Sequence, residues 1–228
     1  YKPLDQTVLM AVAVARTAVE SADWPSEDSV GVNFGSSRGA TALFEKDHLE
    51  FIQTGKVSTL TSPTTTLGNI SSWVSHDLQT DGPAISHSIT CSTGLHAVLN
   101  AVAWLRSGMS EKFLAGASEA PLTPFTIAQM KALKIYATEE SEYPCKALDL
   151  EKKKNTMILG EGAGVLALEI HPKKEPLAYI VGVGFATEKL KHNISISEDA
   201  ECFQKSMKMA LQEAHLDAVD AIVMHAPG

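Results

Sequence analysis

The chain has 228 residues, enough for one large domain or two small ones, with 44% hydrophobic and 20% charged residues, as in ordinary globular proteins. The net charge of −8 gives a nucleic-acid partner no electrostatic support. No apolar run reaches the ~20 residues of a membrane span, and no signal-peptide pattern stands at the N-terminus, so we expect a cytoplasmic protein with no membrane partner.

The cysteines are three in number and have no metal-ligand spacing: Cys91, Cys145 and Cys202. An odd number without a CxxC pair argues against a disulfide framework or a zinc site and suits a reducing compartment.

The first third of the chain predicts a helix, a strand and a broken helix. Residues 5–21 form a largely apolar helical pattern that Asp5 can cap. Residues 29–35 read as a short buried strand, which ends in the small-residue loop 35–39. This loop lacks the Lys-Ser/Thr pair of a P-loop, so a phosphate site is not expected there. Residues 63–78 predict a helix broken near Gly68.

The central stretch predicts a strand, a tight bend and a helix that opens at Cys91. Residues 84–90 alternate with β-branched side chains after the Gly82-Pro83 turn, and residues 95–105 repeat apolar positions every three or four residues. A helix start carries unpaired N–H groups that favour an anion, and the thiolate is the nucleophilic form of cysteine. Position alone leaves a nucleophile and a buried structural cysteine about equally supported.

The remaining chain predicts a further series of elements in an alternating order. They are a strand at 112–116, helical spacing within 119–137, a polar surface loop at 138–154, a glycine-rich turn and strand at 157–169, a linker at 171–176, a strand at 177–186, a helix at 198–215 and a strand at 220–224. Alternation of strands and helices indicates a layered α/β architecture.

Three motifs in this chain resemble those of the β-ketoacyl-ACP synthases, the decarboxylating condensing enzymes of the thiolase superfamily. The motifs are Thr90-Cys91-Ser92-Thr93-Gly94, then Leu114-Ala115-Gly116-Ala117-Ser118-Glu119, then Gly160-Glu161-Gly162-Ala163-Gly164. The resemblance implies a five-layer α/β/α/β/α fold, of which this chain is the central portion. Residues 1–170 would be the N-terminal half without its first strand region, and residues 177–228 the start of the C-terminal half.

The resemblance also implies a reaction. Cys91 would take an acyl group from acyl carrier protein (ACP) as a thioester, and malonyl-ACP would then decarboxylate and condense with it. His225 stands where the family has a catalytic His-Gly-Thr histidine, although Ala226 replaces the glycine. No metal or organic cofactor is implied. A homodimer, or a heterodimer with a related subunit, is expected.

Arg38 and Met130 are the candidate substrate-binding residues. Arg38 falls where many family members carry an apolar residue near the acyl pocket. With other departures from the family's motifs, among them Lys153-Lys154-Asn155-Thr156-Met157 before the glycine-rich signature, it favours a specialised polyene or polyketide-like product, while fatty-acid biosynthesis stays open. A surface or dimer-contact arginine is an equally supported interpretation of Arg38.

Three other functions stay open at this point. A non-decarboxylating thiolase would use acyl-CoA with the same nucleophile. A chain-length-factor-like subunit would be a silent partner, although such subunits typically lack the cysteine. A cysteine hydrolase would need a base beside the thiol, and His96, one helical turn on, is expected to point away from Cys91.

Overall fold

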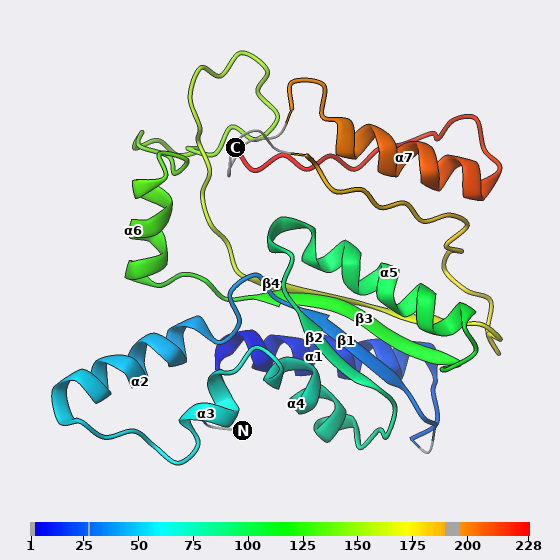
Figure 1. Ribbon diagram of the computed structural model, residues 1–228, viewed down its shortest axis with the longest axis horizontal. Coiled ribbons are helices and arrows are strands. Elements are labelled where there is room, and N and C mark those ends of the chain that lie inside the picture. Colours follow the sequence, from blue (N-terminus) through cyan, green and yellow to red (C-terminus); the bar gives the residue numbers. More distant parts are fainter. Residues whose placement is uncertain (1–2, 27, 190–196) are drawn as a thin grey trace. The chain divides into compact units, whose positions relative to one another are not determined.

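The chain forms two compact units, residues 1–172 with 226–228 and residues 173–225, and each is described by itself. The structure is a computed structural model that describes residues 3–26, 28–189 and 197–228 (Figure 1). The first unit contains α1 (Gln6–Ala22), β1 (Gly31–Gly35), α2 (Thr41–Thr54), α3 (Thr61–Thr65), α4 (Asn69–Leu78), β2 (Ala84–His87), the 3-10 turn η1 (Thr90–Ser92), α5 (Thr93–Arg106), β3 (Lys112–Glu119), α6 (Pro124–Ala132) and β4 (Gly162–Glu169). The second unit contains α7 (Glu201–Ala214).

Helix α1 confirms the predicted first helix and its cap. The Asp5 carboxylate accepts the Thr7 N–H through Oδ1 at 2.9 Å. Its Oδ2 accepts the Leu43 N–H of α2, also at 2.9 Å, so one buried carboxylate holds the starts of two helices. The helix ends where Asp23 takes a left-handed conformation with φ of 57°.

The first unit is built on a four-stranded sheet in the order β2-β1-β3-β4. Strand β1 runs parallel to both neighbours, with Val32 opposite Ala84 on one side and Leu114 on the other. Strand β4 runs antiparallel to β3 and forms one edge, while β2 forms the other. All five residues of β1 are buried, which confirms the short buried strand predicted at residues 29–35.

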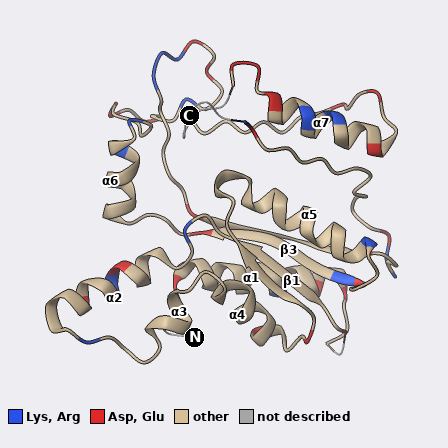
Figure 2. Ribbon diagram, in the orientation of Figure 1, with Lys and Arg blue, Asp and Glu red and all other residues tan. Residues whose placement is uncertain are grey.

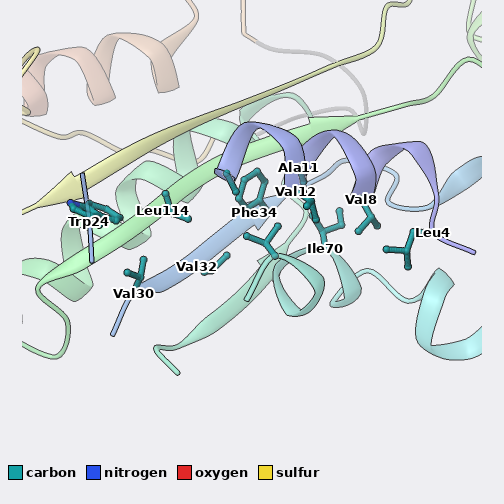
Figure 3. Packing of buried hydrophobic residues seen from close by; sticks show 12 residues of the cluster. Leu4, Val8, Ala11, Val12, Trp24, Val30, Val32, Phe34, Ile70 and Leu114 are labelled. Carbon is teal, nitrogen blue, oxygen red and sulfur yellow. The ribbon is translucent and has the colours of Figure 1, made fainter. Parts of the chain in front are cut away.

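Helices cover both faces of this sheet, so the first unit has three layers. On one face, α1 and α4 pack against side chains of β1 and β3 in a cluster that includes Val8, Ala11, Val32, Phe34, Ile70, Val74 and Leu114 (Figure 3). On the other face, α5 packs against β3 through Ala101, Leu105, Phe113 and Ala115. Burying one such Val, Leu or Phe side chain contributes about 1.5–3 kcal/mol.

Several shorter predictions are confirmed. The helix predicted over 63–78 is broken as expected, since α3 ends at Thr65 and α4 begins at Asn69. The polar stretch 138–154 is a mostly exposed loop, and a single parallel bridge between Tyr136 and Met157 closes its base. Figure 2 shows charged residues on this loop, on α2 and on α7, whereas α5 carries charge only near its C-terminal end.

Two predicted strands in the second unit are wrong. The residues at 177–186 and 220–224 are described, and neither segment forms a strand. Apolar periodicity shows that a segment can be extended, but a strand also requires a hydrogen-bonded neighbour. The first of these segments instead packs on α7, where Gly182 and Gly184 bring its backbone against Ala210 and Ser206. Helix α7 itself confirms the predicted helix at 198–215.

Among the described residues, no helix has the length and apolar character needed to cross a membrane.

Candidate active site

Cys91 lies on a tight connection between β2 and α5. Strand β2 ends at His87, three residues earlier than predicted, and Cys91 is the middle residue of the 3-10 turn η1. Helix α5 begins at Thr93 rather than at Cys91, so the prediction that the helix opens at the cysteine was two residues early. The turn tightens the helix start and leaves Cys91 exposed.

This connection is strained, and one side chain holds it. Thr90, directly before Cys91, has a positive φ of 44°, which a β-branched residue rarely adopts. The Thr93 hydroxyl accepts the Ile89 N–H at 2.9 Å and donates to the Thr90 carbonyl at 2.5 Å. These two bonds join Thr93, which follows Cys91, to the two residues that precede Cys91, and they keep the turn closed.

The start of α5 is arranged to receive an anion. In this turn Ser92 makes no side-chain cap to the helix. Its hydroxyl donates to the Ile89 carbonyl at 3.1 Å. The first N–H groups of α5 therefore gain no capping acceptor from Ser92. His96 bonds the Ser92 carbonyl through Nδ1 at 3.1 Å. A thiolate or a developing oxyanion at this turn would meet the positive end of the helix.

A buried polar network lies beneath the turn, and sequence reasoning missed it. Asn33 of β1 is fully buried and contacts His87 Nδ1 through Nδ2 at 3.0 Å. His87 Nε2 in turn lies 3.1 Å from the Thr93 carbonyl. Partial burial lowers the pKa of His87, the bond to Thr93 opposes this, and nearby His96 adds to the lowering. The available signal was an asparagine in the middle of a buried strand.

The loop 35–39 lies beside this connection and carries Arg38. The Ser36 N–H bonds the His87 carbonyl at 3.2 Å, and the Ser88 hydroxyl bonds the Ser37 carbonyl at 3.3 Å. Arg38 is exposed, and its Nη1 donates to Gln129 Oε1 of α6 at 2.8 Å. Met130 is the next residue of α6. The structure thus brings Arg38 and the Met130 segment together beside the connection that bears Cys91.

His225 is the last residue of the second unit and is exposed. Cys91 belongs to the first unit, so a pairing of His225 with Cys91 stays a prediction.

The other two cysteines stand in different surroundings from Cys91. Cys145 is exposed in the loop after α6. In the second unit, burial and the Glu188 carboxylate raise the pKa of the Cys202 thiol, so Cys202 stays protonated to higher pH. Cys202 is therefore held as a poorly nucleophilic thiol.

Two surface hollows stand out in the part of the chain that is described. One lies at α3 and α4 and the other between α1 and α2, and neither is lined by Cys91, Arg38 or Met130. The chemistry of the elbow makes Cys91 the candidate centre.

Comparison with known proteins identifies the family of the chain. The family described as "Beta-ketoacyl synthase, N-terminal domain" matches residues 1–173. A 3-oxoacyl-(acyl-carrier-protein) synthase 2 of Vibrio harveyi is 30% identical over 206 residues, which are 87% of this chain and 49% of the relative. The corresponding synthase of Staphylococcus aureus is 27% identical over 237 residues, covering 99% of this chain and 58% of its own length. The chain therefore spans about half the length of these curated relatives.

Solved structures show the same fold. A type II polyketide synthase ketosynthase, in complex with its acyl-carrier protein and bound to a hexaketide, superposes with a TM-score of 0.83 at 23% identity, over 93% of this chain and 56% of its own. A β-ketoacyl synthase from Burkholderia phymatum gives 0.80 at 22% identity, over 94% and 55%. The ishigamide ketosynthase/chain length factor gives 0.79 at 19% identity, over 94% and 54%. The predicted thiolase-like α/β fold is confirmed.

Proposed function

Since this chain belongs to the β-ketoacyl synthase family, we propose that it is the Cys91-bearing part of a 3-oxoacyl-ACP synthase, an acyltransferase. The observation that carries the proposal is the exposed Cys91 on a strained turn at the start of α5. A small, open turn at a helix start gives a substrate access to the sulfur and supplies backbone N–H groups for the charge that develops.

In the first step the Cys91 sulfur attacks the carbonyl carbon of an acyl-ACP thioester. The tetrahedral oxyanion is stabilised by backbone N–H groups at the turn, including that of Cys91. The attack forms the new carbon–sulfur bond to Cys91 and releases the thiol proton of Cys91. Collapse of the intermediate restores the carbonyl and breaks the bond to the carrier, whose sulfur takes up that proton. The acyl group is then held as a thioester on the enzyme.

In the second step malonyl-ACP loses carbon dioxide, and the electron pair left on its C2 attacks the Cys91 thioester. A carbon–carbon bond forms, the carbon–sulfur bond breaks, and Cys91 is released as a thiolate. His225 would stabilise the enolate oxygen of the decarboxylating malonyl group by hydrogen bonding, as one of two histidines with this role in the family. The partners are therefore acyl-ACP and malonyl-ACP.

The acyl group is proposed to be that of a specialised polyene or polyketide-like product. Arg38 places a cation beside the connection that bears Cys91, fixed by Gln129 next to Met130. Desolvating a guanidinium against a long aliphatic tail would cost free energy that a polar or conjugated chain avoids. Two of the solved structures similar to this chain are a polyketide ketosynthase and the ishigamide ketosynthase, which supports this substrate class.

The experiment is acylation of the full-length protein by acyl-ACP, read by mass spectrometry of its peptides. We expect the adduct on Cys91, its loss in Cys91→Ser, and its retention in the matched control Cys145→Ser. An adduct on Cys145 or Cys202 and none on Cys91 would contradict the proposal. Equal labelling by acyl-CoA without carrier would favour a thiolase, and no labelling would favour a chain-length-factor-like subunit.

The role of Arg38 is tested by the chain-length profile of the acyl group. We expect Arg38→Ile to improve transfer of saturated chains of eight or more carbons without changing transfer of the shortest, while Arg38→Lys keeps the original preference. An unchanged profile in Arg38→Ile would assign Arg38 to the surface or to a subunit contact.

A further inference from the structure

The side of the sheet that faces α5 contains a chain of hydrogen-bonded polar groups where an apolar core is expected. We call this chain, which joins Asn100, Asn33, His87 and Thr93, the relay. Val32 and Phe34 of β1 point into the α1 face, so Asn33 between them points toward α5. There its Oδ1 accepts the Asn100 Nδ2–H of α5 at 2.9 Å. A buried amide in a strand lowers the apolar area of the core, so its polar contacts require an explanation.

The hydrogen atoms of this relay can be assigned from its partners. Asn33 Nδ2 lies 2.9 Å from the Ile85 carbonyl, which can only accept, so that group of Asn33 is the NH₂. Its second hydrogen points to His87 Nδ1, which must therefore accept. The proton of a neutral His87 then resides on Nε2 and is donated to the Thr93 carbonyl. The contacts Asn100–Asn33, Asn33–His87 and His87–Thr93 then each join one donor to one acceptor.

The relay ends at the residue that holds the cysteine turn. The Thr93 carbonyl is fixed by His87, and the Thr93 hydroxyl spans the turn from Ile89 to Thr90. Gly35 of β1 makes this approach possible, because a methyl group there would collide with the Thr93 side chain. The backbone at Cys91 is thereby tied to the sheet through His87.

We propose that His87 is a positioning residue for Cys91: Asn33 and Asn100 fix the imidazole as the Nε2–H tautomer, which holds Thr93 and with it the turn that presents the thiol. The inference rests on the proposed function only in taking Cys91 as the nucleophile. His87 touches no reacting atom and acts through Thr93.

The test is the rate of Cys91 alkylation by iodoacetamide in the full-length protein, divided by the rate at exposed Cys145 and resolved by peptide mass spectrometry. His87→Asn keeps an acceptor for Asn33 but is too short to reach the Thr93 carbonyl. His87→Gln extends an amide N–H to the position of Nε2. We expect the Cys91/Cys145 ratio to fall about fivefold in the Asn variant, the scale of losing one helix-terminus interaction, and to be restored in the Gln variant.

A structural role alone would lower the melting temperature of both variants and leave the ratio unchanged, which would overturn the proposal. If the His87→Asn variant does not fold, Asn100→Ala removes the outer end of the relay at a half-buried site and should lower the ratio in the same direction. An unchanged ratio in that variant overturns the proposal as well. Alkylation does not depend on acyl-ACP, so failure of Cys91 acylation would count against the proposed function and leave this inference standing.

Discussion

At the scale of single residues, Thr93 shows how one side chain can serve two purposes. Thr93 is buried, and its hydroxyl closes the turn around Cys91 by accepting the Ile89 N–H. Its carbonyl accepts a hydrogen bond from His87 Nε2. A serine could make the same bonds, but the Thr93 methyl also fills the space above Gly35. The nucleophile turn is thus packed and hydrogen-bonded from the side of the sheet.

His225 is expected to act in condensation and not in acyl transfer. Its replacement by alanine should leave acylation of Cys91 unchanged, because backbone N–H groups at the turn, and not His225, are proposed to stabilise the charge that develops in acyl transfer. Condensation should fall by roughly a hundredfold, the scale of losing one preorganised donor to a developing charge. The two steps are measured separately with acyl-ACP and malonyl-ACP. His171→Ala, at an exposed histidine of the first unit, is the matched control. Equal loss of both steps would make His225 the base of the thiol instead.

His87 predicts how the stability of the chain depends on pH. Its pKa is lowered in the folded state from 6.5, so the unfolded chain binds more protons over that range. Stability from the neutral imidazole is full above pH 6.5 and is lost as the pH falls toward the lowered pKa.

Besides His87 itself, the titratable groups on β1, β2 and α5 are His96, whose charge also opposes that of His87, and Arg106 in the last turn of α5. In denaturant unfolding of the full-length protein, the free energy of unfolding of the wild type should exceed that of His87→Gln by a larger amount at pH 7.5 than at pH 5.5. A gap that widens at low pH would contradict the lowered pKa of His87.

At the scale of elements, the contact between β1 and β3 is tight enough to be tested by one methyl group. Gly31 pairs with Phe113, and a Cβ at Gly31 would run into that fully buried ring. Gly31→Ala should cost about 1–3 kcal/mol of unfolding free energy, the usual range for overpacking.

Phe113→Leu should relieve part of that cost, so the double variant should lose less than the sum of the two single variants. Gly164→Ala on β4 is the control, because no atom lies within 4 Å of the added methyl. Additive costs at Gly31 and Phe113 would show that the ring yields and that the packing is looser than the structure indicates.

At the scale of the whole molecule, strand β2 is an edge of the described sheet, and an unprotected edge favours association. We expect the full-length protein to form a homodimer through this edge, or a heterodimer with a related subunit. Light scattering of the full-length protein at micromolar concentration should give twice the mass of one full-length subunit. A monomer would argue against the homodimer, and a mass that doubles only on co-expression with a related subunit would identify the heterodimer.

The sequence by itself determined the features that depend on neighbours along the chain. The cap of α1 by Asp5, the break near Gly68, the amphipathic α7 and the elbow around Cys91 were all readable, because their causes lie within a few residues. The motifs around Cys91 and Gly162 were sufficient to identify the family.

Only the tertiary structure decided which distant residues meet. Asn33 contacts His87 across 54 positions and Asn100 across 67, and no local pattern encodes such a pair. The failed strands at 177–186 and 220–224 have the same cause, since a strand is completed by hydrogen bonds to another segment. Local periodicity therefore could not predict that Asn33, His87 and Asn100 position the turn that bears Cys91. These residues meet only when β1, β2 and α5 pack together.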